Sequence, residues 1–196
     1  MGSPKRQQDF DCLSYGDYLG WPEDERYELI AGRAYAMTPA PTVTHQKVVG
    51  AIHRQLAEAL DDSPCEVLIA PVDVLLPQGE EADEEVATVV QPDLLVVCDP
   101  AKVDERRVRG APDWIIEVLS SATAARDQIR KRDLYERHGV REYWLVHPTD
   151  RVVVIYRRED SGFGKSEVAE MAGNSAARAI PGVSIDWGRV TRRLPR

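Results

Sequence analysis

The sequence predicts an α/β (α+β) fold, in which a central mixed β-sheet is flanked by helices and preceded by an N-terminal β-hairpin. Short apolar runs bounded by proline or charged residues predict the strands, and two stretches with apolar residues at helical spacing predict the helices. Their order is hairpin, helix, several strands, helix and two strands, which is typical of a sheet covered by helices. At 196 residues, the chain fits one domain with one core.

The first expected elements are the hairpin and a long helix. YELI and AYAM flank Ala31-Gly32-Arg33, which predicts two strands joined at a turn that contains Gly32. From about Thr42 to Leu60 the apolar residues recur at helical spacing, and the sequence DDSP ends the pattern. This stretch therefore predicts the first helix.

The strands of the sheet are expected in CEVLIA, VDVLLP, QPDLLVV and APDWIIEVL, because each apolar run is bounded by proline or charge. SSAT provides a cap for a second helix from Ala124 to about His138, which Gly139 closes. REYWLVH and RVVVIYR then predict two further strands, joined near Pro148-Thr149-Asp150.

We expect residues 1–26 to form a leader, residues 27–160 the main domain, and residues 161–196 a C-terminal extension that packs on it. The extension has a weaker pattern, with one short strand expected at 183–185. No run approaches the roughly 18 apolar residues of a membrane span, and no signal peptide is visible. We therefore expect a soluble cytoplasmic protein without a membrane partner.

Composition narrows the classes of function. Cys12, Cys65 and Cys98 are odd in number and far apart, which favours reduced thiols and argues against a zinc site. The net charge of -8 argues at first sight against a nucleic-acid partner, but removing the five acidic charges of GEEADEE, interpreted as a solvated loop, leaves -3. Positive charge gathers at three places: Lys102, Arg106, Arg107 and Arg109; Arg126, Arg130, Lys131 and Arg132; and Arg189, Arg192, Arg193 and Arg196.

A carboxylate lies inside the most apolar strand. WIIEVL places apolar residues on both faces, which is typical of a strand in the middle of a sheet, yet it contains Glu117. An unpaired ion there would cost several kcal/mol, so the carboxylate must be neutralised, paired or bound to metal.

Asp93 opens one strand, and Glu117 lies 24 residues later in a strand that also begins with Pro-Asp. If these strands are neighbours, the two carboxylates converge and need a cation such as Mg²⁺. In the following helix, Asp127, Lys131 and Tyr135 share one face at i, i+4 and i+8. A lysine beside a metal can orient a water or stabilise charge on a phosphate, so the combination predicts phosphodiester hydrolysis.

Each of these residues also has a purely structural interpretation. Asp93 follows a proline and could cap or end a strand. Glu117 could pair with an arginine. Lys131 and Asp127 could form a surface pair worth about 0.3–0.5 kcal/mol. Only the combination favours a functional site.

Three further candidates are less specific. His45 lies on the apolar stripe of the first helix, where a half-buried histidine is more common than a ligand. Glu28 and Asp73 lie in strand-like settings, where a structural partner is as frequent as a ligand. The chain has no Gly-rich phosphate loop, GxSxG elbow or HExxH motif, so we expect no nucleotide cofactor and no serine-hydrolase or zincin chemistry.

A resemblance to a known family covers about Tyr27 to Tyr156. It is carried by YELIAGRAYAMTPAPTVTHQKVVGAIHRQL, EVLIAPVDVLLP, QPDLLVV and GAPDWIIEVLSSATAARDQIRKRDLYERHGVREYWLV, in this order. These stretches resemble the Uma family (DUF820-like) of restriction-endonuclease-like proteins, which is assigned to the PD-(D/E)xK nuclease superfamily. The resemblance implies a restriction-endonuclease-like core within residues 27–160, with acids that bind Mg²⁺.

Carried over by motif, Asp93 is the Asp of "PD" and Glu117 is the acid of the second half-motif. The backbone carbonyl of Val118 is the further metal ligand that the resemblance implies. Leu119 stands where the superfamily pattern has Lys, and Lys131 matches the position to which this family moves the lysine.

Glu28 and His45 match positions that recur in the first half of the family. The resemblance thus implies a Mg²⁺-dependent or Mn²⁺-dependent endonuclease that acts on DNA, and cutting two strands with one-site subunits favours a homodimer. Two alternatives stay open: a noncatalytic module that keeps the fold for dimerisation or nucleic-acid binding, and a hydrolase of small phosphoesters.

Overall fold

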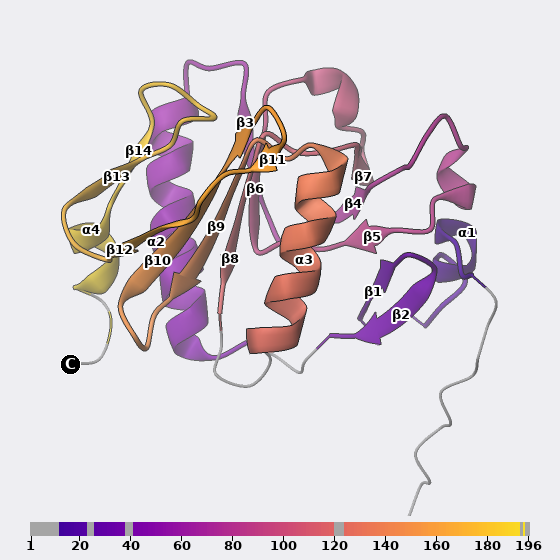
Figure 1. Ribbon diagram of the computed structural model, residues 1–196, viewed down its shortest axis with the longest axis horizontal. Coiled ribbons are helices and arrows are strands. Elements are labelled where there is room, and N and C mark those ends of the chain that lie inside the picture. Colours follow the sequence, from indigo (N-terminus) through magenta and orange to yellow (C-terminus); the bar gives the residue numbers. More distant parts are fainter. Residues whose placement is uncertain (1–11, 23–25, 38–40, 120–123, 193, 195–196) are drawn as a thin grey trace, which may run out of the picture.

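The protein is built on a central sheet, a smaller second sheet and two long helices (Figure 1). The computed structural model describes residues 12–22, 26–37, 41–119, 124–192 and 194, and the side chains of 124–128 lie outside this description. The central sheet has seven strands: β3 (Glu66–Ile69), β6 (Leu94–Val97), β8 (Trp114–Val118), β9 (Glu142–His147), β10 (Val152–Glu159), β11 (Gly162–Phe163) and β12 (Glu167–Glu170).

The central sheet is mixed, as the sequence predicts. Its order is β11-β10-β9-β8-β6-β3, with β12 also paired to β10. Strands β8 and β9 run parallel, whereas β8 and β6 run antiparallel. Strand β8 therefore has a hydrogen-bonded neighbour along each edge, as expected for a strand in the middle of a sheet.

The hairpin predicted around Gly32 is confirmed, but it belongs to a second sheet. This sheet contains β1 (Tyr27–Ile30), β2 (Arg33–Ala36), β4 (Asp73–Leu75), β5 (Val89–Val90) and β7 (Arg107–Arg109), in the order β2-β1-β5-β4-β7. The second sheet lies on the same side of the central sheet as the later of the two long helices (Figure 1).

The helices are α1 (Tyr15–Tyr18), α2 (Val43–Leu60), α3 (Ala124–His138) and α4 (Trp187–Thr191), with 3₁₀ turns η1 (Asp83–Glu85) and η2 (Pro100–Lys102). Both long helices match their predicted ranges. Thr42 caps α2 by accepting a hydrogen bond from the His45 N–H at 3.1 Å. The predicted SSAT cap of α3 lies outside the described residues. Within those residues, no helix is both long and apolar enough to cross a membrane.

The two faces of the central sheet are covered differently. Helix α2 and residues 171–190 bury one face, with Trp114, Ile116 and Val118 of β8 in that core. Helix α3 and the second sheet bury the other, with Ile115 of β8 in that core. Because side chains alternate along a strand, Glu117 points to the α3 side.

The C-terminal residues extend the same structure. Strands β11 and β12 are part of the central sheet, and β13 (Asn174–Ala176) pairs with β14 (Ser184–Asp186) beside α2. The strand expected at 183–185 is thus β14. The other short strands of this region were not predicted, since they are two to four residues long and carry no clear alternation.

The expectation of three reduced cysteines is wrong for one pair. Cys65 and Cys98 form a disulfide, and Cys12 is an exposed free thiol. Cys65 directly precedes β3 and Cys98 directly follows β6. Since Glu66 pairs with Val97 in these antiparallel strands, the two cysteines face each other although 33 residues separate them.

The interpretation of GEEADEE as a wholly solvated loop is also wrong. Asp83 in η1 forms ion pairs with Arg107, at 2.6 Å, and with Arg109. Part of the acidic run therefore neutralises the basic stretch that follows η2.

The turn of the β1–β2 hairpin yields a test of the fold. Gly32 has a φ of +74°, and a Cβ built on it would lie 2.6 Å from Cys12 Sγ and 2.8 Å from Cys12 Cα. We expect Gly32→Ala to lower the free energy of unfolding by about 1–3 kcal/mol in urea titrations. Gly50→Ala is the control, because Gly50 lies in α2 with open space around it; it should raise stability by roughly 0.5–1 kcal/mol. Equal effects of the two variants would contradict this account.

Candidate active site

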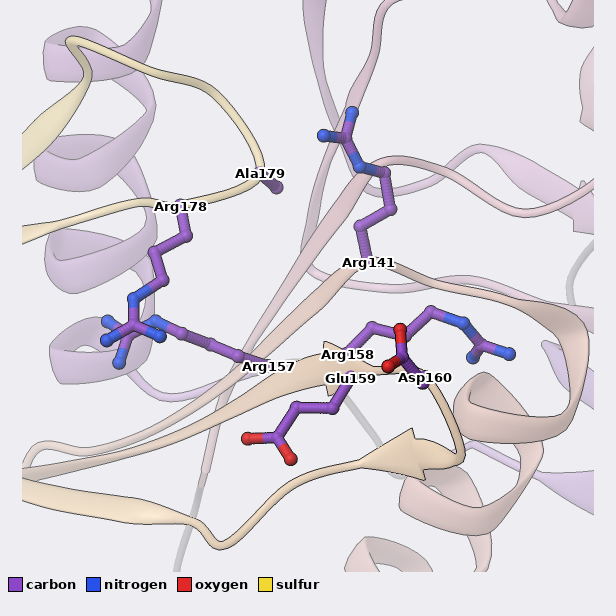
Figure 2. A pocket seen from close by; sticks show the side chains of 7 residues that line it. All are labelled: Arg141, Arg157, Arg158, Glu159, Asp160, Arg178 and Ala179. Atoms are coloured by element: carbon purple, nitrogen blue, oxygen red, sulfur yellow. The ribbon is translucent and has the colours of Figure 1, made fainter.

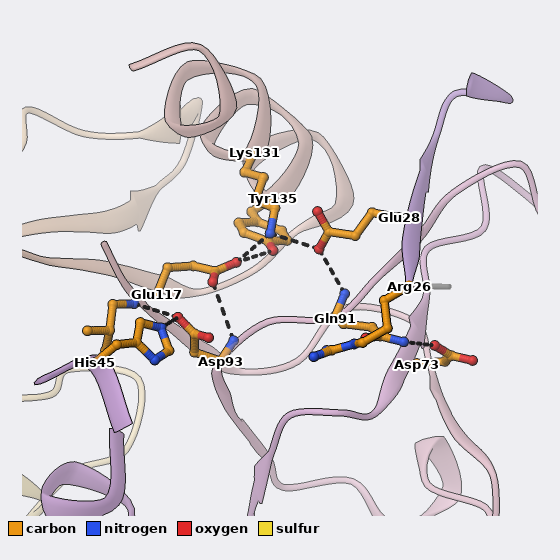
Figure 3. A network of polar contacts seen from close by, with 10 residues as sticks. Arg26, Glu28, His45, Asp73, Gln91, Asp93, Glu117, Lys131 and Tyr135 are labelled. Carbon is orange, nitrogen blue, oxygen red and sulfur yellow. Dashed lines mark hydrogen bonds and ion pairs between the residues drawn. The ribbon is translucent and has the colours of Figure 1, made fainter. Parts of the chain in front are cut away.

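Asp93 and Glu117 lie side by side, as the sequence predicts for neighbouring strands. Strands β6 and β8 pair with Leu94 opposite Ile116, which puts the residue before β6 next to the end of β8. The Asp93 N–H donates to Glu117 Oε2 at 3.3 Å, and the Val118 N–H donates to Asp93 Oδ2 at 2.8 Å. Two carboxylates thus meet at one end of the central sheet (Figure 3).

Lys131 of α3 reaches into this pair of acids. Its Nζ lies 2.9 Å from Glu117 Oε1 and 2.8 Å from Glu28 Oε1, and its side chain is only 14% exposed. Tyr135, one turn later, donates its hydroxyl to the same Glu117 Oε1 at 3.1 Å. The cationic partner of Glu117 is therefore this lysine and not an arginine. Asp127 belongs to α3, but its side chain lies outside the described residues.

Glu28 brings the second sheet into the cluster. It lies on β1 and is buried, and its Oε1 also accepts the Gln91 N–H at 3.0 Å. The hairpin therefore supplies a third carboxylate to the group formed by the central sheet and α3.

His45, in the first turn of α2, completes the opposite side of the cluster. Its Nε2 lies 3.1 Å from Asp93 Oδ2, and its side chain is largely buried. Burial acts to lower the pKa of His45, but the hydrogen bond and charge of Asp93 outweigh it, so this pKa is raised. The expected half-buried histidine is thus also a direct neighbour of an acid in the cluster.

Asp73 lies outside the first group of contacts. Its Oδ1 accepts hydrogen bonds from Gln91 Nε2 at 2.8 Å and from the Tyr18 hydroxyl at 3.1 Å, while Arg26 binds Gln91 Oε1 at 2.6 Å. Gln91 thereby links Asp73 to Glu28 through its own N–H. Sequence reasoning did not single out Gln91, although it directly precedes the Pro92-Asp93 motif.

The cluster has an excess of negative charge. Lys131 contacts the carboxylates of Glu28 and Glu117, and the carboxylate of Asp93 lies beside them with His45 as its partner. Burial raises the pKa of Glu117 to about 7, with Lys131 opposing this shift and Asp93 and Glu28 adding to it. Burial acts to lower the pKa of Lys131, but the charges of Glu117 and Glu28 outweigh it and raise this pKa, so the ammonium form persists.

This donor set fits a hard divalent cation. Asp93 and Glu117 offer carboxylate oxygens, which are the ligands that Mg²⁺ prefers in proteins. Among the described residues, no group of three or more His, Cys, Asp or Glu side chains is arranged to hold a metal. That is compatible with Mg²⁺, which typically uses one or two carboxylates and completes its shell with water.

Known proteins are similar to this chain in sequence or in fold. Residues 15–188 match the family described as "Uma2: Putative restriction endonuclease". An uncharacterized protein of Synechocystis sp. is 27% identical over 156 residues, which are 78% of each chain. A crystal structure from Anabaena variabilis, described as that of a putative nuclease belonging to DUF820, has a TM-score of 0.72 at 17% identity, over 92% of this chain and 98% of the other. That likeness shows the same fold.

The pKa of Glu117 yields a prediction on stability. Because its folded pKa of about 7 exceeds its ordinary value of 4.5, the native state holds a proton that the unfolded chain has lost between these pH values. The free energy of unfolding should therefore fall as pH rises through this window, by roughly 1–3 kcal/mol for this group. The pKa of His45 is also raised, so its titration should lower the free energy of unfolding as pH rises as well.

The test is urea unfolding of metal-free protein from pH 4.5 to 8, for the wild type and Glu117→Gln. The glutamine cannot titrate, so the variant should show a smaller slope, and the difference reports Glu117. Glu58→Gln, at an exposed position of α2, should keep the wild-type slope. An unchanged slope in Glu117→Gln would refute the assigned shift.

Proposed function

Since the chain belongs to the Uma2 family, we propose that it is a Mg²⁺-dependent nuclease that hydrolyses DNA phosphodiester bonds at the cluster of Asp93, Glu117 and Lys131. The observation that carries the proposal is the convergence of these three side chains. They come from two neighbouring strands and the following helix, and Lys131 Nζ lies 2.9 Å from the Glu117 carboxylate that Asp93 contacts.

Asp93, Glu117 and the backbone carbonyl of Val118 would hold the cation, Mg²⁺ or Mn²⁺. When bound there, such an ion polarises a phosphodiester and lowers the pKa of a bound water. Among the described residues, both contacts of the Asp93 carboxylate use Oδ2, so Oδ1 would be the oxygen that binds a ligand. His45 and the Val118 N–H fix the orientation of that carboxylate.

Lys131 would act as a fixed positive charge. Because two carboxylates raise its pKa, it stays protonated and cannot take a proton from water. It can donate hydrogen bonds to a water or to a phosphate oxygen and offset negative charge that builds up during cleavage. Leu119, at the superfamily's lysine position, packs among apolar residues and offers no such group.

Glu28 and Tyr135 would position the other side chains. Glu28 holds Lys131 from the side of the second sheet, and Tyr135 holds Glu117 from α3. Among the described residues, neither forms a hydrogen bond with Asp93, so we assign them to support and not to cation binding.

Contacts to the DNA backbone would come from fewer basic residues than the sequence suggests. Arg107 and Arg109 are engaged by Asp83, and Lys102 donates to the Ala111 carbonyl at 2.9 Å. Arg130 lies next to Lys131 in α3 and covers the Tyr35 ring of β2 at 4.5 Å from its centroid. This cation beside the acids supports phosphate binding there.

The homodimer and the cytoplasmic location stay predictions.

The test is cleavage of supercoiled plasmid and of single-stranded DNA with Mg²⁺ or Mn²⁺. We expect Asp93→Asn, Glu117→Gln and Lys131→Met each to reduce the cleavage rate about 100-fold or more, because each removes a charge at the reacting phosphate. Glu58→Gln and Lys165→Met are matched controls at exposed positions and should cleave like the wild type.

Mn²⁺ binding, measured by electron paramagnetic resonance, gives a second readout that does not depend on turnover. Asp93→Asn and Glu117→Gln should weaken it at least about tenfold, whereas the controls should not. Cleavage by Glu117→Gln at the wild-type rate would rule out the assigned site. A wild type that binds DNA in a salt-dependent way in EDTA, but cuts neither substrate, would instead favour the noncatalytic binding module.

A further inference from the structure

An aromatic ring and a guanidinium group are stacked beside the acidic cluster. Tyr35 on β2 lies opposite Glu28 in the antiparallel register of the hairpin. Side chains that lie directly opposite each other point to the same face of a sheet, with Cβ atoms about 4.5–5.5 Å apart. Arg130 of α3 covers the Tyr35 ring, and its Cζ lies 4.5 Å from the ring centroid. The Tyr35–Arg130 stack is therefore a direct neighbour of Glu28.

The same helix and hairpin also form the ion pair of the proposed active site. Arg130 directly precedes Lys131 in α3, and Lys131 Nζ lies 2.8 Å from Glu28 Oε1. The two elements thus meet in two adjacent contacts, the Glu28–Lys131 ion pair and the Tyr35–Arg130 stack. A nucleotide that adjoins a phosphate at Lys131 would consequently lie next to the stack.

The stack is accessible from the surface. Tyr35 and Arg130 are both partly exposed, and Ile129, which precedes Arg130, is 67% exposed. Strand β2 is the outermost strand of the second sheet, so no described strand pairs with its free edge. Among the residues whose side chains are described, no carboxylate pairs with Arg130. A guanidinium plane with a ring on one side can accept a second flat group on the other.

The charges of the surface do not favour a DNA duplex as the ligand. The chain carries -8, whereas duplex binding depends largely on the neutralisation of phosphates by Lys and Arg. Carboxylates of the chain pair with arginines across the described surface, among them Arg107, Arg109, Arg132, Arg141, Arg157 and Arg189. These arginines are not available to neutralise the two charged backbones of a duplex.

A hollow at the end of β10 illustrates this neutralisation (Figure 2). Its lining includes two carboxylates and four arginines, namely Glu159, Asp160, Arg141, Arg157, Arg158 and Arg178. Asp113 pairs with Arg141. Glu142 and Glu167 both pair with Arg157. With these partners counted, carboxylates outnumber guanidinium groups, so the hollow does not attract a phosphate backbone.

We propose that the Tyr35–Arg130 stack binds a nucleobase, so that the substrate of the proposed nuclease is single-stranded DNA or an unpaired stretch of DNA. The inference rests on the proposed function for the class of its ligand, which is nucleic acid. The bases of a duplex are stacked on one another, whereas an unpaired base can stack on an aromatic ring or a guanidinium plane. Stacking is tolerant of sequence and adds affinity without further positive charge, which suits an acidic protein.

The stack also has a purely structural interpretation, in which it only fixes the hairpin to α3. The two interpretations differ in what they imply for binding. A structural contact would affect the binding of any DNA backbone equally, with or without bases. A base-binding contact would affect only DNA whose bases are present and unpaired.

The test is fluorescence anisotropy in EDTA at low salt, with a short labelled thymidine oligonucleotide and with the same sugar-phosphate backbone without bases. Because the two ligands carry the same charge, the ratio of their dissociation constants reports the base contacts alone. Arg130→Lys keeps the charge and removes the plane, and Tyr35→Leu removes the ring. Arg106→Lys is the matched control, at an exposed position before β7. Urea unfolding checks that all three variants fold.

We expect the wild type to bind the intact strand at least about tenfold more tightly than the backbone without bases. This ratio should fall to about twofold in Arg130→Lys and in Tyr35→Leu, and it should stay at the wild-type value in Arg106→Lys. Annealing the oligonucleotide to its adenosine complement should weaken binding to the wild type, because pairing and stacking hide the faces of the bases.

Three results would overturn the proposal: no preference of the wild type for the intact strand, a preference that Arg130→Lys and Tyr35→Leu leave unchanged, or equally tight binding of the duplex. Because metal is absent, base-dependent binding is measured whether or not the protein cleaves DNA. Cleavage without base-dependent binding would refute only this inference. Base-dependent binding without cleavage in Mg²⁺ or Mn²⁺ would support it and refute only the nuclease.

Discussion

The site depends on one buried ammonium group. Lys131 of α3 lies between Glu117 of β8 and Glu28 of β1, so a single charge joins the helix, the central sheet and the second sheet. Removing one partner of such a buried pair leaves an uncompensated charge, which costs about 3–5 kcal/mol. The three elements are therefore held in one arrangement by electrostatics as well as by their shared apolar core.

This arrangement is not the most stable one that the chain could have. Burial raises the pKa of Glu117 to about 7, and an apolar residue at 117 would avoid this cost of burying a carboxylate. Departures from local stability of this kind are expected where a protein binds or reacts, because the unfavourable charge is compensated when a ligand arrives. The same departure made Glu117 visible in the sequence, since every other position of WIIEVL is apolar.

Sequence reasoning reached the residues whose signals are local. Three local signals predicted that Asp93, Glu117 and Lys131 converge. They are the apolar pattern of β8, the repeated Pro-Asp before β6 and β8, and the helical spacing of Lys131 and Tyr135. Glu28 and His45 had only weak local signals, which the family resemblance strengthened. Gln91, the Cys65–Cys98 disulfide and the Asp83 ion pairs were missed, because each depends on which distant strands pair and in what register. The second sheet was missed for the same reason: its strands look like those of the first.

A comparison of two buried glutamates explains why sequence alone could not separate a site from a structural contact. Glu117 in WIIEVL and Glu142 in REYWLV both lie in the central sheet at nearly complete burial. Glu142 pairs with Arg157 and accepts three further hydrogen bonds, so the arginine pairing considered for Glu117 describes Glu142 instead. Glu117 must share its cation with Glu28 and lies beside Asp93. The number of carboxylates around one positive charge, which only the folded chain determines, therefore distinguishes the contacts of Glu117 from those of Glu142.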